Sequence, residues 1–232
     1  MTTLPTCICN DAWKFQGREL RLHADVQDTS TDAWKRLLEL VEETATRKLE
    51  EFAPGQQLAP DDWHSIVTLP ASIGKLTTVK RLVLYGSSLV RIPPEIGGMS
   101  SLEEFDPYTS YRLHWFPYEI TRCPNLKQSR VSTRALYGNY KYRSPFPYLG
   151  GESAKEALER LRPLACGVCR KTFDVDRTYV RWLSLRVATD VLPLLAYVCS
   201  VACVEALPKP PEGYVSGPHL GGRSLVQPPP RY

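Results

Sequence analysis

Four cysteines in the C-terminal part of the chain have the spacing of a metal site. They form a C-x2-C pair and a C-x3-C pair with 29 residues between them, and they are Cys166, Cys169, Cys199 and Cys203. Thiolate sulfur is a preferred ligand of zinc, and two such pairs are typical of four-thiolate structural sites. Four protein ligands leave no open position for water, so the predicted zinc is structural. The alternative is four buried thiols that bind no metal.

The other residues capable of chemistry form no such constellation. Cys7 and Cys9 make a C-x-C pair, but with no further ligand near them in the sequence we favour two ordinary thiols over a metal site. None of the four histidines lies in a recognisable nucleophile or metalloenzyme motif; they are His23, His64, His114 and His219. The sequence also contains no phosphate-binding glycine loop. We therefore predict a protein that is not an enzyme.

The elements around the paired cysteines are readable from the pattern. Residues 178–187 and 191–198 read as a hairpin with its turn at Thr189-Asp190, and residues 200–207 read as a helix. Gly167 is expected to let the first cysteine loop turn so that backbone amides face the sulfurs. A further helix is expected to start at a Ser153 cap, pass Leu161 and stop before Pro163.

This order of loop, hairpin and helix resembles the treble-clef zinc fingers. The Cys-Ser-x-x-Cys motif at the start of the last helix supports the resemblance, although its spacing is one residue longer than the more usual C-x2-C. The resemblance implies a small α+β module over residues 151–206 held by one structural zinc ion.

A repeat precedes this module. Leu69-Pro70, Ile92-Pro93 and Phe116-Pro117 begin equivalent units at offsets of 23 and 24 residues, and the apolar positions that follow keep the same register. A fixed period in the twenties with an L-x-x-L-x-L core is typical of leucine-rich repeats, whose units must stack to bury their apolar faces.

The unit is similar to the intracellular Ras-suppressor type of leucine-rich repeat, whose consensus sequence begins Leu-Pro-x-x-Ile-Gly-x-Leu. Residues 69–91 match closely, whereas the third unit has Ser129 at a leucine position and Arg134 where Asn is usual. In the first two units Ser87 and Ser110 hold the Asn position, where serine can still bond the turn. The resemblance implies an α/β solenoid with parallel strands over residues 63–150.

The N-terminal residues 1–62 are expected to cap this solenoid. Glu19 to Ala24 alternate in polarity like a strand. From Asp32 to Phe52 the apolar residues fall on one helical face, with Ser30 or Thr31 as the N-cap and Ala53-Pro54-Gly55 as the end. The tail, residues 207–232, is rich in Pro and Gly and is expected to be extended or disordered and not packed.

Outward strand positions of the repeats define a concave face. Parallel stacking would set Tyr85 beside Tyr108, and Tyr and Arg commonly anchor protein interfaces. We predict that a protein partner binds this face; the alternative is cross-strand ladders on a solvated surface. The predicted positions, three from each unit, are Arg81, Val83, Tyr85, Glu104, Asp106, Tyr108, Gln128, Arg130 and Ser132.

Charge is distributed unevenly. Against a net charge of +4, residues 1–62 carry −5 and residues 63–150 carry +6. This contrast predicts attraction between the cap and the repeats, or an acidic partner. The stretch 122–143 holds six Lys/Arg, no acid and three tyrosines. With the zinc module, it could bind nucleic acid, although tyrosines that cover the end of the solenoid are the simpler interpretation.

Composition sets broader limits. Hydrophobic content of 43% and charged content of 23% in 232 residues are globular values. No apolar run is long enough to span a bilayer, no signal peptide is visible, and seven cysteines do not resemble a secreted disulfide framework. We therefore expect a cytoplasmic protein; its oligomeric state and the identity of its partner are beyond the sequence.

Overall fold

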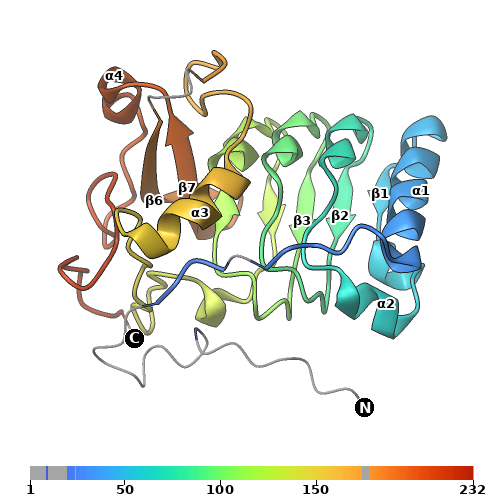
Figure 1. Cartoon of the computed structure of the whole chain (residues 1–232), viewed down its shortest axis with the longest axis horizontal. Coiled ribbons are helices and arrows are strands. Elements are labelled where there is room, and N and C mark those ends of the chain that lie inside the picture. The colour runs from blue at the N-terminus through green and yellow to red at the C-terminus, as the bar shows by residue number, and fades with distance from the viewer. Residues whose placement is uncertain (1–8, 10–19, 24, 174–177, 232) are drawn as a thin grey trace.

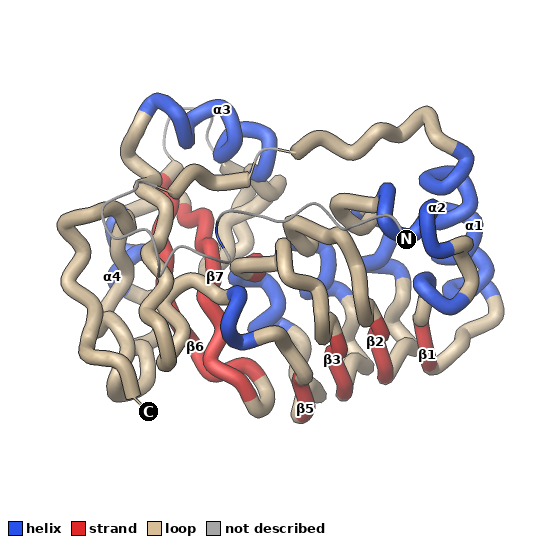
Figure 2. The backbone as a smooth tube through the Cα atoms, turned by 90° about the horizontal axis from the view of Figure 1, so that it is seen from below, coloured by secondary structure: helices blue, strands red, loops and turns tan. Residues whose placement is uncertain are grey.

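Short parallel strands line one side of the molecule. The computed structural model describes residues 9, 20–23, 25–173 and 178–231. Its larger sheet has the strand order β1-β2-β3-β5 (Figure 2), and every pair of neighbours is parallel. The strands are β1 (Glu51–Phe52), β2 (Arg81–Val83), β3 (Glu104–Asp106) and β5 (Gln128–Ser129). The last three are the strands that the repeat register predicts.

A row of 3-10 helices lies behind the strands. They are η3 (Ala71–Lys75), η4 (Pro94–Gly98) and η5 (Tyr118–Arg122), and each follows the x-Pro step that begins a unit. Proline fixes the backbone at these starts and removes an N–H that would have no helical partner. A Cβ at Gly98 would lie 2.9 Å from the carbonyl oxygen of Gly74, so the glycine allows adjacent helices to approach. Alternating strands and short helices confirm a leucine-rich-repeat-like arrangement.

The turns after the strands are linked by serines. The Oγ atoms of Ser87 and Ser110 are 2.7 Å apart, and Ser110 Oγ donates to the carbonyl oxygen of Leu84. In the next turn Ser132, and not Arg134, accepts from the backbone N–H of Thr109 at 2.9 Å. Ser87 and Ser110 therefore bond the turns as predicted, and in the third unit Ser132 does so instead of Arg134.

The first helix of the N-terminal cap is shorter than predicted. Helix α1 (Asp32–Thr46) starts at the predicted N-cap, Thr31, but ends well before Phe52. Lys48 adopts a positive φ of 52°, which stops the helix, and Glu51–Phe52 then pairs with β2 as β1. Phe52 fits the helical spacing of apolar residues only by coincidence. It is fully buried, at 0% exposure, because it belongs to the core beneath the sheet.

The remaining cap elements close the solenoid. A short 3-10 helix, η2 (Pro54–Gln56), and helix α2 (Pro60–Ser65) follow β1, so Ala53-Pro54-Gly55 ends a strand and not a helix. The strand expected around residues 19–24 is not formed by its described residues, Leu20 to His23. Leu20 and Leu22 are nevertheless buried, which explains their alternation.

The C-terminal hairpin is joined to the last repeat. Strands β6 (Tyr179–Val187) and β7 (Asp190–Val198) pair antiparallel, and β7 also pairs in parallel with β4 (Phe116–Pro117). The predicted hairpin is confirmed, but its turn lies at Ala188-Thr189, where Ala188 has a φ of 52°. Helix α3 (Glu152–Leu161) packs in front of the hairpin and α4 (Val201–Glu205) follows it (Figure 1). The N-cap of α3 is Gly151, so the predicted Ser153 cap is wrong.

Two hydrophobic clusters hold these parts together. The larger one extends from α1 through the repeats to the hairpin. The smaller one lies between the last repeat, α3, the hairpin and the N-terminal segment, with Trp182 at its centre in contact with the rings of Trp115, Tyr137 and Phe146. Each aromatic pair adds about 0.5–1.5 kcal/mol beyond the burial of its area.

The tail is extended but packed, which corrects the prediction of an unpacked segment. His219 and Trp182 exchange backbone hydrogen bonds of 2.8 and 2.9 Å. Arg143 donates to the carbonyl oxygen of Gly213, and Gln227 donates to that of Arg143. The low apolar content of the tail predicted disorder. Hydrogen bonds between the backbone of the tail and the rest of the protein hold it in place instead, and composition does not reveal such bonds.

The predicted attraction between the acidic cap and the basic repeats is confirmed. Ion pairs cross between them at Lys75–Glu42, Lys80–Glu50, Arg81–Glu51 and Arg112–Asp25. The first three are exposed, so each adds little to stability. Within the described ranges, no helix is both long and apolar enough to cross a bilayer.

Candidate metal centre and concave face

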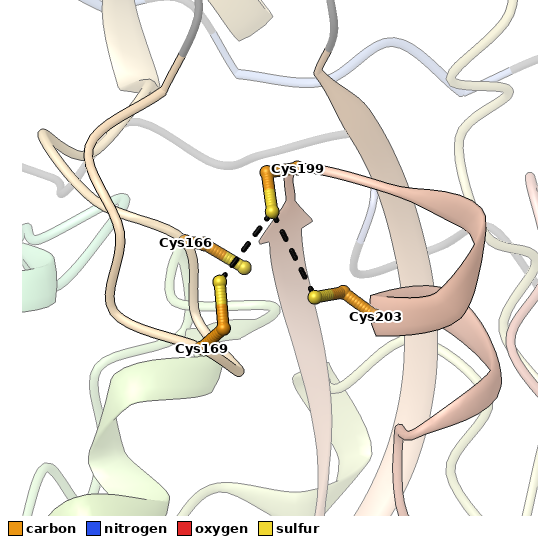
Figure 3. Close-up of side chains that lie close together, drawn as sticks. All are labelled: Cys166, Cys169, Cys199 and Cys203. Atoms are coloured by element: carbon orange, nitrogen blue, oxygen red, sulfur yellow. Dashed lines mark hydrogen bonds between the residues drawn. The ribbon is translucent and has the colours of Figure 1, made fainter.

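The structure brings the four paired cysteines together. The sulfurs of Cys166, Cys169, Cys199 and Cys203 all lie within 4.8 Å of one another. Figure 3 shows the first pair on a loop, Cys199 at the end of β7, and Cys203 on α4. This is the predicted order of loop, hairpin and helix.

The sulfur separations suit a tetrahedral metal. Two thiolates on one zinc ion, with Zn–S bonds of about 2.3 Å, lie about 3.8 Å apart. The observed separations are 3.7 Å between Cys199 and Cys203 and 3.4 Å between Cys169 and Cys199. The donor set and its size are therefore compatible with zinc.

The first cysteine loop is a tight turn. The backbone N–H of Cys166 donates to the carbonyl oxygen of Lys171, and that of Arg170 donates back to Cys166, at 2.9 and 3.0 Å. Arg170 has a positive φ of 62°. Gly167 has another role than predicted: its N–H donates to the carbonyl oxygen of Tyr197 and not to a sulfur. A Cβ there would lie 2.9 Å from Tyr118, so glycine is required for close packing.

Hydrogen bonds within the cluster favour a thiolate. The backbone N–H of Lys171, followed by the thiol of Cys199, lowers the pKa of Cys169 to about 7. The same shared bond, with Cys199 as its donor, raises the pKa of Cys199 to about 12. The Cys169 sulfur is therefore partly deprotonated near neutral pH and ready to bind a cation, whereas a metal must displace the proton of Cys199.

The last cysteine pair is positioned by a helix cap. Ser200 is the N-cap of α4, and its Oγ accepts from the backbone N–H of Cys203 at 3.1 Å. From the repeat side, Arg122 donates to the carbonyl oxygens of Cys166 and Gly167 at 3.1 and 2.8 Å. The cluster is thus fixed both by its own module and by the last repeat.

The concave face has the predicted neighbours. The rings of Tyr85 and Tyr108 have centroids 6.2 Å apart, and the guanidinium of Arg130 lies 5.8 and 5.3 Å from the two centroids. Arg130 also donates to both carboxylate oxygens of Asp106. Tyr85 and Tyr108 are 53% and 42% exposed, so this cluster is open to solvent on a rigid base.

Other predicted positions on the face differ in exposure. Arg81 pairs with Glu104 across the strands, and Gln128 is exposed. Val83 lines a hollow of this face together with Tyr85 and Arg130 but is only 8% exposed. Asp106 is buried to the same extent and supports Arg130. Ser132 is half-buried and bonds the turn of Thr109. These last three residues therefore form the base of the face.

Most of the basic stretch, residues 122–143, contacts the protein itself. Tyr137 is buried at 1% exposure. Arg134 is exposed, and Lys141 lies over the ring of Tyr140. The other cations have intramolecular partners: Arg122 with backbone carbonyls, Lys127 with Glu103, Arg130 with Asp106, and Arg143 with the tail. The interpretation that this segment covers the end of the solenoid gains support.

A further group of ligating side chains was missed from the sequence. Cys9, His23 and His114 lie with their ligand atoms within 4.8 Å of one another. The expectation that Cys9 has no further ligand nearby is therefore wrong. No spacing rule links these positions, since the fold alone brings residue 114 to residues 9 and 23. Cys7 lies outside the described residues.

Comparison with known proteins adds little. No protein-family model matches the sequence, and no curated protein matches it. A solved structure of a leucine-rich-repeat protein from Leptospira interrogans is similar over 56% of this chain and 37% of that one, with 18% identity and a TM-score of 0.28. So distant a likeness carries no argument, and the fold assignment rests on the repeats themselves.

Proposed function

We propose that this chain is a protein-interaction scaffold that binds a protein partner through its concave face. The observation that carries the proposal is the exposed cluster of Tyr85, Tyr108 and Arg130. Aromatic and Arg side chains dominate binding energy at interfaces. Tyrosine does so because it buries a large area with only two rotatable bonds, and arginine because its planar guanidinium can bond and stack at once. We further propose that the repeats are of the Ras-suppressor type, because the first unit matches the consensus sequence of that type.

Preorganisation supports this choice over a merely solvated ladder. Arg130 is held by Asp106, which is 8% exposed, and by two rings. A side chain that is already ordered loses less entropy on binding, where immobilising a free one costs about 0.5–1.5 kcal/mol.

We also propose that the four-cysteine cluster binds one structural zinc ion in a treble-clef-like module. Support comes from the sulfur separations and from the capped helix that presents Cys203. Because β7 pairs with the last repeat, the zinc would brace that end of the solenoid, which otherwise exposes its apolar edge. Thiolate ligands must remain reduced, which fits a cytoplasmic location.

The alternative is a nucleic-acid-binding protein that uses residues 122–143 and the zinc module. The intramolecular contacts of Arg122, Lys127 and Arg143 count against it, because a cation already bound to the protein has less to offer a phosphate. A catalytic function is a weaker proposal still, since a closed four-thiolate zinc has no position for substrate.

The binding proposal is tested with alanine variants. A partner recovered from the native cell and identified by mass spectrometry is purified, and its affinity is measured by calorimetry. Tyr85→Ala and Tyr108→Ala should each weaken binding by about 1–3 kcal/mol, or roughly 5- to 150-fold, without loss of thermal stability. Tyr111→Ala is the matched control, because Tyr111 is 52% exposed but lies outside the strands.

Two further variants test the nucleic-acid alternative. Arg134→Ala and Lys141→Ala should leave binding to the protein partner unchanged. If they abolish binding while the tyrosine variants bind normally, and if affinity falls steeply with salt, the concave-face proposal is wrong and phosphate contacts are responsible.

The zinc proposal has its own test. Native mass spectrometry of Cys166→Ser/Cys199→Ser should show one zinc fewer per chain than the unmodified protein. Equal zinc content in the two proteins would contradict the proposed ligands.

A further inference from the structure

We propose that Cys9, His23 and His114 form a second metal site, of the class that binds zinc. It is separate from the four-cysteine cluster and draws its ligands from two distant parts of the chain. Cys9 and His23 come from the N-terminal segment, and His114 comes from the loop that precedes β4.

The distances match a metal with mixed ligands. A thiolate and an imidazole nitrogen on one tetrahedral zinc, with bonds of about 2.3 and 2.0–2.1 Å, lie about 3.6 Å apart. The observed distance from Cys9 Sγ to His23 Nε2 is 3.5 Å. The His114 ring centroid lies 5.3 Å from that of His23, and its ligand atom falls within 4.8 Å of the other two. The three groups therefore converge on one point.

The outer nitrogens of both histidines have the partners typical of metal ligands. His23 Nδ1 lies 3.3 Å from Asp25 Oδ2, and His114 Nδ1 lies 2.6 Å from the carbonyl oxygen of Ala135. Such acceptors place the proton of each imidazole on Nδ1, and on His23 the other nitrogen, Nε2, is the atom that faces Cys9 Sγ. A carboxylate on one histidine and a backbone carbonyl on the other are the usual means of fixing ligand orientation.

The site is enclosed. Cys9 is 4% exposed and His114 is 0% exposed, and Cys9 belongs to the smaller hydrophobic cluster with Tyr137 and Trp182. Asp25 is itself fixed, because Arg112 donates to its carboxylate and Arg91 to its backbone carbonyl. A metal here would tie the N-terminal segment to the end of the second repeat, much as the four-cysteine cluster ties the hairpin to the last one.

The same contacts fit a different chemistry, a Cys9–His23–Asp25 relay in which the imidazole takes the proton of the Cys9 thiol and leaves a nucleophilic thiolate. Two observations favour a metal. Burial of Cys9 denies a substrate access to the sulfur, and the relay leaves no role for His114, whose Nδ1 is nevertheless fixed by a carbonyl. Cys7 lies outside the described residues and is not part of the proposed site.

Metal content tests the proposal on the full chain expressed with zinc in the medium. Native mass spectrometry of Cys166→Ser/Cys199→Ser should still show one bound zinc, and His23→Gln added to that variant should remove it. His64→Gln is the control, because His64 lies in α2 and in neither cluster. Circular dichroism establishes that each variant is folded.

A measurement on the unmodified protein keeps the test valid if the variants fail to fold. X-ray absorption at the zinc edge should show imidazole nitrogen as well as sulfur among the ligands, and native mass spectrometry should show two zinc ions per chain. One zinc ion with sulfur ligands alone would overturn the proposal. So would rapid alkylation of Cys9 by iodoacetamide in zinc-replete protein, which would favour the nucleophile instead.

Discussion

One glycine in the tail provides a sharp test of whether that segment is docked. Gly221 has a φ of 73°, and a Cβ on it would overlap the carbonyl oxygen of Pro147. We consider the substitution Gly221→Ala. Gly217→Ala is the matched control, because nothing lies within 4 Å of the Cβ that it would add.

The expected magnitude follows from the contacts around Gly221. The left-handed conformation costs an alanine about 1–2 kcal/mol. The overlap with Pro147 cannot be relieved by a side-chain rotation, because the obstructing atom belongs to the backbone. The segment should therefore lift away, which costs three hydrogen bonds to the rest of the protein: Gly222 N–H to Phe146, Leu149 N–H to Leu220 and Trp182 N–H to His219. At about 1 kcal/mol each, we expect a loss of roughly 3 kcal/mol.

Urea denaturation measures this loss, and amide hydrogen exchange locates it. Gly221→Ala should lower the free energy of unfolding and speed exchange at Leu149 and Trp182, whose N–H groups donate to the tail. Gly217→Ala should change the free energy by less than about 0.5 kcal/mol, as surface substitutions usually do. Equal stability of the two variants would refute the docked tail.

Further predictions concern the core, the tail at low pH and the metal. Leu82→Ala should cost about 2–5 kcal/mol in urea denaturation, because Leu82 is fully buried; a loss below 1 kcal/mol would contradict its place in the core. Burial lowers the pKa of His219 to about 4, below its usual 6.5, so its contribution is present above pH 6.5 and is lost as pH falls toward 4. At about 1.4 kcal/mol per pKa unit, the free energy of unfolding should fall by roughly 3 kcal/mol over this range. His219→Gln should flatten this part of the stability–pH curve, and an unchanged curve would contradict the role of His219. A zinc chelator should lower the melting temperature of the unmodified protein, whereas Cys166→Ser/Cys199→Ser should respond less; equal shifts would contradict the zinc brace.

The sequence was most informative where a local rule operates. The repeat offsets located β2, β3 and β5 because each unit must bury equivalent side chains. The paired cysteines and the hairpin between them were located for a similar reason, since ligands of one metal must be held by a turn and a helix start. The neighbours Tyr85 and Tyr108 followed from parallel stacking alone.

The sequence was least informative where distant segments meet. Phe52 continued a helical pattern, yet it pairs with β2. The tail lacks apolar residues, yet Trp182 exchanges hydrogen bonds with it. Cys9 and His114 are more than a hundred positions apart in the sequence, and no spacing motif spans such a separation. In each case the partner is chosen by tertiary structure, which local periodicity does not encode.

Site-specific photocrosslinking tests the central claim most directly. A photoreactive amino acid is placed at position 108 on the concave face and, in a second protein, at position 134 on the exposed part of the basic stretch. In the native cell, position 108 should crosslink to one protein partner, and Tyr85→Ala in the same chain should reduce that product. Crosslinks to nucleic acid or protein from position 134 alone, with none from position 108, would contradict the proposed binding face.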